Sequence, residues 1–163
     1  MRLIRALKKL KAFQGLTEQE LAWVLYDVGN SAYTMLACSL IPIWFKSIAV
    51  GHAPGQISSD NATAYYSLAV SIVTVAVALL GPVLGALADH KDKKRMYFTS
   101  AAALGMIFCV LTGFAWSWLL FLILFVVTKI CYSASLTIYD SMLGDITTED
   151  RMDEVSSNGF AWG

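Results

Sequence analysis

Long apolar runs that are almost free of charge are the feature that most constrains the fold of this chain. Leu21–Phe45 contains one charged residue, Asp27, and Ala64–Ala88 contains none. Met96–Tyr139 is a run of 44 residues with one charge, Lys129. Because crossing a hydrocarbon layer takes roughly 20 helical residues, the first two runs each supply one membrane span and the third supplies two. The sequence therefore predicts an all-α, polytopic membrane protein.

The boundaries of these spans follow from the breaks between the runs. The segment Gly113–Trp118 (GFAWSW) combines a glycine with two tryptophans, which suits a turn at the membrane interface. After a basic N-terminal segment, residues 1–20, we expect spans near 21–47, 63–88, 95–115 and 118–143. The residues from about 155 onward have the character of the opening of a fifth span. We therefore expect a fragment, residues 21–163 being part of a larger helical bundle whose further C-terminal spans are its partners.

Lysine and arginine predict the orientation of the spans, because these residues gather in cytoplasmic loops. Ten of the twelve flank the spans on one side: five precede the first span, four join the second and third, and Arg151 follows the fourth. Lys46 stands on the opposite side. We therefore expect a cytoplasmic N-terminus, in the plasma or inner membrane of a bacterial host or the vacuolar membrane of a fungal one.

Polar and ionisable side chains inside the spans are the candidate functional residues, because each charge there costs roughly 2.5–3.5 kcal/mol. Asp27 and Asn30 share a face of the first span. Lys129 lies near the bilayer midplane of the fourth span, about three turns from Asp140 and on nearly the same face. One hypothesis is that Lys129 contacts an anionic substrate group or a mobile carboxylate, while Asp27 or Asp140 exchanges protons. The alternative is structural, with Asp27 capping a helix end or bonding to backbone and Asp140 pairing with a cytoplasmic cation.

Motifs for nucleotide binding, metal binding and hydrolysis do not occur in the sequence, which contains no GxxxxGK[ST] and no HExxH. Its three cysteines, Cys38, Cys109 and Cys131, lie inside apolar runs without metal-ligand spacing. Its basic residues cluster beside the spans rather than on a soluble face. We therefore expect no enzymatic activity, no cofactor, no metal site and no nucleic-acid partner.

A charged segment joins the second and third spans, and its sequence is Gly85-Ala-Leu-Ala-Asp89-His-Lys-Asp-Lys93-Lys94-Arg95. Gly85 and Asp89 are four residues apart and so share a helix face, and the glycine would admit a close neighbouring helix. The segment resembles the signature loop of the major facilitator superfamily, G-x-L-x-D-R-x-G-R-[RK]. His90 and Asp92 depart from that pattern, where arginine and glycine are usual.

Three more stretches resemble the Atg22-like (UMF1) group of that superfamily: Trp23–Ala32 (WVLYDVGNSA), Gly81–Gly85 (GPVLG) and Val155–Gly163 (VSSNGFAWG). The resemblance implies a secondary transporter of about twelve helices, which moves a small polar solute by alternating access. Efflux of amino acids is the activity that the group suggests.

The resemblance also assigns a conformational-latch motif to Gly85, Asp89, Lys93, Lys94 and Arg95. Asp89 would contact a helix end in the other half of the transporter, Gly85 would give clearance, and the basic residues would pair locally. A four-span scaffold or assembly protein without transport activity is the alternative function.

Overall fold

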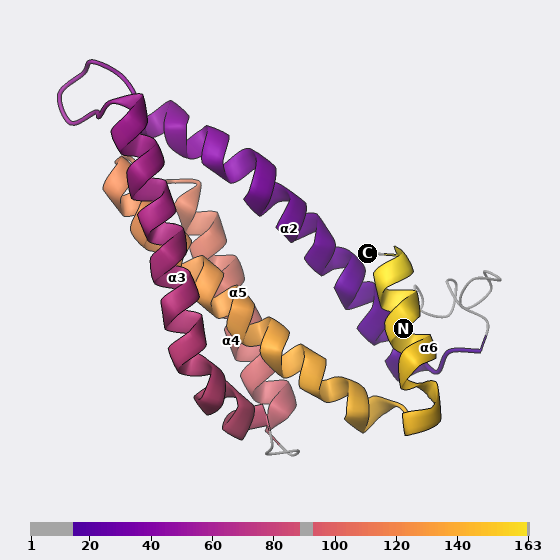
Figure 1. Cartoon of the computed structure of the whole chain (residues 1–163). Coiled ribbons are helices and arrows are strands. Elements are labelled where there is room, and N and C mark those ends of the chain that lie inside the picture. Colours follow the sequence, from indigo (N-terminus) through magenta and orange to yellow (C-terminus); the bar gives the residue numbers. More distant parts are fainter. Residues whose placement is uncertain (1–14, 89–92, 163) are drawn as a thin grey trace. The chain divides into compact units, whose positions relative to one another are not determined.

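Five α-helices make up the part of the chain that the computed structural model describes, residues 15–88 and 93–162 (Figure 1). Their bounds are Glu18–Ala49 (α2), Ser59–Ala88 (α3), Lys94–Thr112 (α4), Trp118–Ile146 (α5) and Glu149–Trp162 (α6). Within those residues there is no strand beyond an isolated bridge between Val50 and Ile57. Most of the basic N-terminal segment and Asp89 of the latch motif lie outside the described residues.

Four of the helices, α2 to α5, are long and apolar enough to cross a membrane. At 1.5 Å per residue, the 30 residues of α3 extend about 45 Å, more than the roughly 30 Å hydrocarbon thickness. The predicted all-α class with four spans is therefore confirmed. The fifth helix, α6, begins at Glu149, before the expected start near 155. Its first turn carries Glu149 and Asp150, whose charges favour a helix N-terminus.

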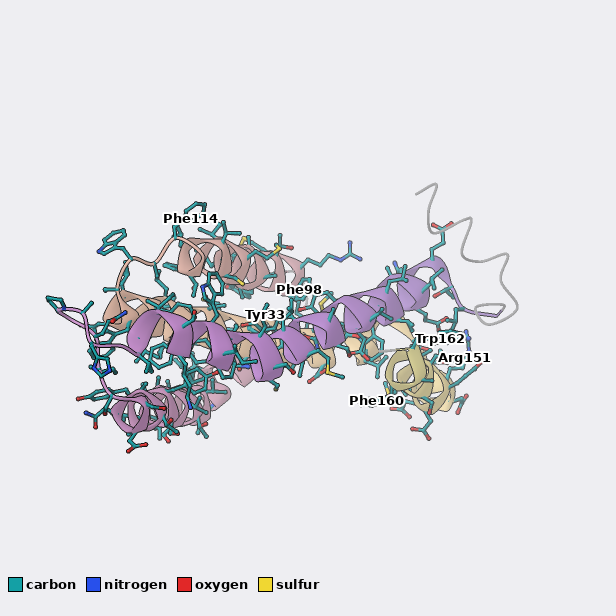
Figure 2. All side chains as sticks on the ribbon, turned by 90° about the horizontal axis from the view of Figure 1, so that it is seen from above. Tyr33, Phe98, Phe114, Arg151, Phe160 and Trp162 are labelled. Atoms are coloured by element: carbon teal, nitrogen blue, oxygen red, sulfur yellow. The ribbon has the colours of Figure 1, made fainter. Side chains whose placement is uncertain are left out.

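Large apolar side chains are exposed along these helices. Met35 on α2 is 72% exposed, Leu79 on α3 is 74% exposed, and Met106 on α4 is 64% exposed. Phe114, on the connection between α4 and α5, projects away from the helices in Figure 2 and is 74% exposed. Such exposure would be costly in water but matches a surface that is solvated by lipid tails. The chain is a multi-pass integral membrane protein.

The larger of two compact units comprises residues 39–141. Its core packs Phe45 of α2 against Phe121 of α5, with ring centroids 5.6 Å apart, and buries Ala69 of α3 in the same cluster. The side chain of Trp118 at the start of α5 donates a hydrogen bond from Nε1 to the carbonyl of Gly55, at 3.0 Å. This bond holds the loop before α3 to the beginning of α5.

The smaller unit comprises residues 15–38 and 142–162. Leu21 of α2 and Val155 of α6 are fully buried in its core. The start of α2 is fixed by a capping box, in which the Thr17 N–H donates to Glu20 Oε2 at 2.7 Å and the Glu20 N–H donates to Thr17 Oγ1 at 3.2 Å. Two backbone donors that the first turn leaves unpaired are thereby satisfied.

Candidate functional site

Lys129 lies on one polar face of α5, near the middle of the helix. Phe125, Lys129 and Ser133 are spaced four residues apart, so their side chains leave the same side of α5. All three line a cavity of about 360 Å³ between α3 and α5. The opposite wall is supplied by α3, through Val70, Val73, Thr74 and Val77.

The cavity combines one positive charge with two hydroxyl groups. The Lys129 ammonium lies 5.1 Å from the centroid of the Tyr132 ring, within the range of a cation–π contact. Thr74 Oγ1 donates to the carbonyl of Val70 at 3.0 Å, so its hydrogen is already used and the oxygen can act as an acceptor. None of the lining residues is acidic. The cavity thus places one ammonium group and two hydroxyl groups among apolar side chains.

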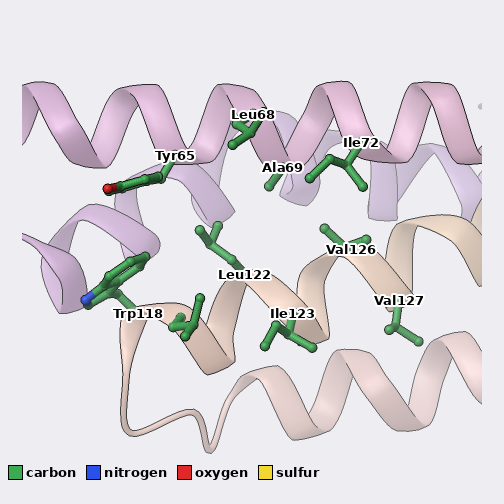
Figure 3. Close-up of a pocket in the computed structure, with 10 residues that line it drawn as sticks. Tyr65, Leu68, Ala69, Ile72, Trp118, Leu122, Ile123, Val126 and Val127 are labelled. Atoms are coloured by element: carbon green, nitrogen blue, oxygen red, sulfur yellow. The ribbon is translucent and has the colours of Figure 1, made fainter.

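A second cavity, of about 400 Å³, lies between the same two helices and is almost entirely apolar (Figure 3). Tyr65 of α3 and Trp118 of α5 stack at one end, with ring centroids 5.2 Å apart. Leu68, Ile72 and Val126 are among the aliphatic side chains along its length. Because no charged residue lines this cavity, its chemistry is limited to apolar contact, unlike that of the cavity at Lys129.

Asp27 and Asn30 belong to the smaller unit, whereas Lys129 belongs to the larger one. α6 crosses α2 directly over Asp27, at Gly159. A methyl group at Gly159 would lie 3.1 Å from Asp27 Oδ2 and 3.0 Å from the Trp23 ring, so only glycine fits without a shift. Asn30 Oδ1 is buried and accepts no hydrogen bond from any described residue. Asp27 thus lies at a close contact between α2 and α6.

Asp140 is exposed on α5 and does not line the cavity at Lys129. Of the latch motif, Lys93 and Arg95 are exposed, and a methyl group at Gly85 would meet no atom of the described residues within 4 Å. Lys94 differs from them. It is only 8% exposed, and its Nζ donates to the carbonyl of Ser141 at 3.2 Å, which anchors the start of α4 to α5.

The structure also reveals a polar node that the sequence expectations did not include. Glu20 is 1% exposed, and its Oε1 accepts a hydrogen bond from Thr147 Oγ1 at 2.8 Å and pairs with Arg151 Nη1 at 3.2 Å. Arg151 Nη2 in turn donates to the carbonyl of Gly15 at 2.9 Å. The node joins the start of α2 to the connection between α5 and α6. The Thr17-x-x-Glu20 spacing was the available signal for the cap, but the sequence does not identify Arg151 as the partner.

A metal site built from three or more His, Cys, Asp or Glu ligands is absent from the residues that the structure describes. The polar features of the described residues include an ammonium group in a cavity, a carboxylate at a contact between helices and a buried ion pair.

Comparison with known proteins identifies the family. Residues 23–163 match the Major Facilitator Superfamily. The chain belongs to that superfamily. It is 37% identical over 150 residues to "Uncharacterized MFS-type transporter YxiO" of Bacillus subtilis (strain 168), an alignment that covers 90% of this chain. The chain spans 34% of the length of that relative. No solved structure matches it.

The four apolar helices lie almost entirely within the residues that match the major facilitator superfamily. The family points to transport rather than to enzymatic catalysis. An ionisable group at membrane depth is, in such a protein, the first candidate for contact with a transported solute or ion.

Proposed function

We propose that the complete protein is a secondary transporter that moves a small polar solute by alternating access. The observation that supports this most directly is the Lys129 ammonium in a cavity between two apolar helices. A charge in that position costs roughly 2.5–3.5 kcal/mol on insertion scales, which makes Lys129 a candidate contact for a solute or ion. Sites for solutes in such proteins lie near the bilayer midplane, between helices of the bundle. A non-transporting scaffold is not favoured by the family.

Within the superfamily, we assign the chain to the Atg22-like (UMF1) group and propose amino acids as the solutes. The support is the set of sequence stretches that resemble the group, of which one contains Asp27 and Asn30 and another contains Gly159. In the structure, Gly159 packs against Asp27. Asp27 is our candidate for proton exchange, and Asp140 is the second, since its side chain is exposed at the C-terminal part of α5.

The latch motif and the orientation complete the proposal. The N-terminus lies in the cytoplasm, as does the loop between α3 and α4. Asp89 contacts a helix end in the other half of the transporter, and Gly85 gives that helix room to approach. Among the described residues, no atom would lie within 4 Å of a methyl group at Gly85, which leaves room for such a helix.

Uptake by proteoliposomes containing the complete gene product tests the proposal. Radiolabelled amino acids are offered with and without a pH gradient, and we expect accumulation of at least one of them above protein-free vesicles. Lys129→Ala should abolish this uptake in folded, correctly inserted protein. Lys46→Ala, at the exposed end of α2, is the matched control and should leave it unchanged. Uptake that is equal in wild type and Lys129→Ala would rule out the assigned role of Lys129.

A further inference from the structure

We propose that Asp27 and Asn30, on one face of α2, form a binding site for a monovalent metal cation, namely sodium. Asp27 lies six residues, about 9 Å, into the apolar run that begins at Leu21. Asn30 follows three residues later, so the two side chains are neighbours on the helix surface, with Cβ atoms about 5–6 Å apart. The inference goes beyond the proposed transport function, because sodium binding can be measured without any solute.

Asn30 contributes a buried oxygen that lacks a donor. Its Oδ1 is shielded from solvent, and no described residue donates a hydrogen bond to it. The hydroxyl of Thr34, one turn further along α2, donates instead to the backbone carbonyl of Asn30, at 3.2 Å. A buried carbonyl oxygen without a partner is unfavourable, and in folded proteins such an atom usually contacts a donor, an ordered water or an ion.

Asp27 supplies the negative charge beside that oxygen. Within residues 15–88 and 93–162, no side chain forms a hydrogen bond or an ion pair with its carboxylate. Its Oδ2 lies instead against α6, 3.1 Å from the position that a methyl group at Gly159 would occupy. Glycine has no side chain that could neutralise a charge. A carboxylate inside an apolar span is costly without a partner, and a bound cation removes that cost.

The ligand atoms indicate which cation fits. Carboxylate and side-chain amide oxygens are ligands of hard cations. The sequence expectation of no metal site concerned the ligand patterns of zinc and other transition metals, and the described residues indeed contain no group of three or more His, Cys, Asp or Glu ligands. A single carboxylate neutralises a monovalent ion, whereas a divalent ion would keep a net charge in apolar surroundings. Sodium suits the pair better than potassium, because the smaller ion completes its coordination with fewer oxygens.

The same pair can also hold a proton. When protonated, Asp27 becomes a hydrogen-bond donor, for which Asn30 Oδ1 is the neighbouring acceptor. A sodium ion would occupy the same oxygens. Sodium is therefore a competitor of the proton exchange that we propose for Asp27.

Thermal unfolding of the complete protein, purified in detergent micelles, tests the site. It is measured in sodium, potassium, choline and methylammonium chloride at equal ionic strength, because a ligand of the folded state raises the unfolding temperature with its concentration. We expect sodium to raise that temperature above the value in choline, and to do so more than potassium. Asp27→Asn should abolish the sodium effect. Asn30→Leu should raise the sodium concentration at half-effect by about tenfold or more.

The Asn30→Leu variant also separates a sodium ligand from a structural residue. In choline it should be at least as stable as the wild type, because the unsatisfied oxygen has been removed. A purely structural asparagine would instead give the same loss of stability in both salts. Asp60→Asn and Asn61→Ala are the matched controls, exposed at the start of α3, and should keep the full sodium effect.

Three results would overturn the proposal: equal unfolding temperatures of the wild type in sodium and choline, a sodium effect that survives Asp27→Asn, or stabilisation by methylammonium without stabilisation by sodium. The last result would assign the pair to an amine. The uptake assay keeps the transport function separate. Uptake by a protein that sodium does not stabilise leaves transport standing and the sodium site wrong, whereas sodium stabilisation without any uptake leaves the site standing and transport wrong.

Discussion

Replacing Glu20 tests whether burial increases the contribution of the Glu20–Arg151 ion pair to stability. Arg151 pairs with two carboxylates: Glu20, with a side chain 2% exposed, at 3.2 Å, and Glu154, with a side chain 57% exposed, at 3.4 Å. The two nitrogen–oxygen distances are nearly equal, but Glu20 is buried whereas Glu154 is exposed to solvent. A double-mutant cycle of Glu20→Gln with Arg151→Gln isolates the first pair, and a cycle of Glu154→Gln with Arg151→Gln isolates the second.

The structure sets the expected size of each coupling. A hydrogen bond to a charged group contributes about 1.5–3 kcal/mol when it is shielded from water. Because the Arg151 side chain is 33% exposed, water can partly replace Glu20, and we expect a coupling of about 1–2 kcal/mol. Glu154 is solvated, so its coupling should stay below about 0.5 kcal/mol. The bond from Arg151 to Gly15 is lost in both cycles and therefore cancels.

Unfolding of the complete protein in mixed detergent micelles, followed by tryptophan fluorescence, gives the free energies of unfolding for both cycles. Repeating the measurement at high salt should weaken the Glu154 coupling while leaving most of the Glu20 coupling. Equal couplings for the two carboxylates would refute the reasoning, because proximity alone would then account for the pair.

Two further substitutions test other contacts by the same unfolding measurement. Gly159→Ala inserts a methyl group into the close contact between α6 and α2 and should destabilise the protein by about 1–3 kcal/mol. Gly81→Ala, where a methyl group meets no described atom within 4 Å, should not destabilise it. Similar losses at the two sites would contradict the close packing. Trp118→Phe removes the donor to Gly55 and should cost about 0.5–1.5 kcal/mol, whereas Trp116→Phe, on a side chain that is 86% exposed, should change stability by less than about 0.5 kcal/mol. A Trp118 effect no larger than that of Trp116 would show that the bond is not a stabilising one.

The four spans could be predicted because charge is so scarce along them: Asp27 and Lys129 stand out against runs of apolar residues. The early start of α6 could not be found by the same criterion, since Glu149 begins a polar turn that resembles a loop in hydropathy alone. Thr74 is one of several hydroxyl residues along α3, and only packing against α5 distinguishes it from the others. The partner of Glu20 likewise depends on tertiary structure, because Arg151 is distant in the sequence.

Glu20 and its partners Thr147 and Arg151 lie far apart in the sequence, and this distance has a consequence for biosynthesis. Thr147 is 127 residues beyond Glu20, so the ribosome completes three further membrane spans before that partner exists. During this interval the Thr17 capping box is the part of the node that can already form. Glu20 then still lacks its contacts with Thr147 and Arg151. The contacts that fix the start of α2 to the connection between α5 and α6 can therefore form only after the fourth span has been synthesised.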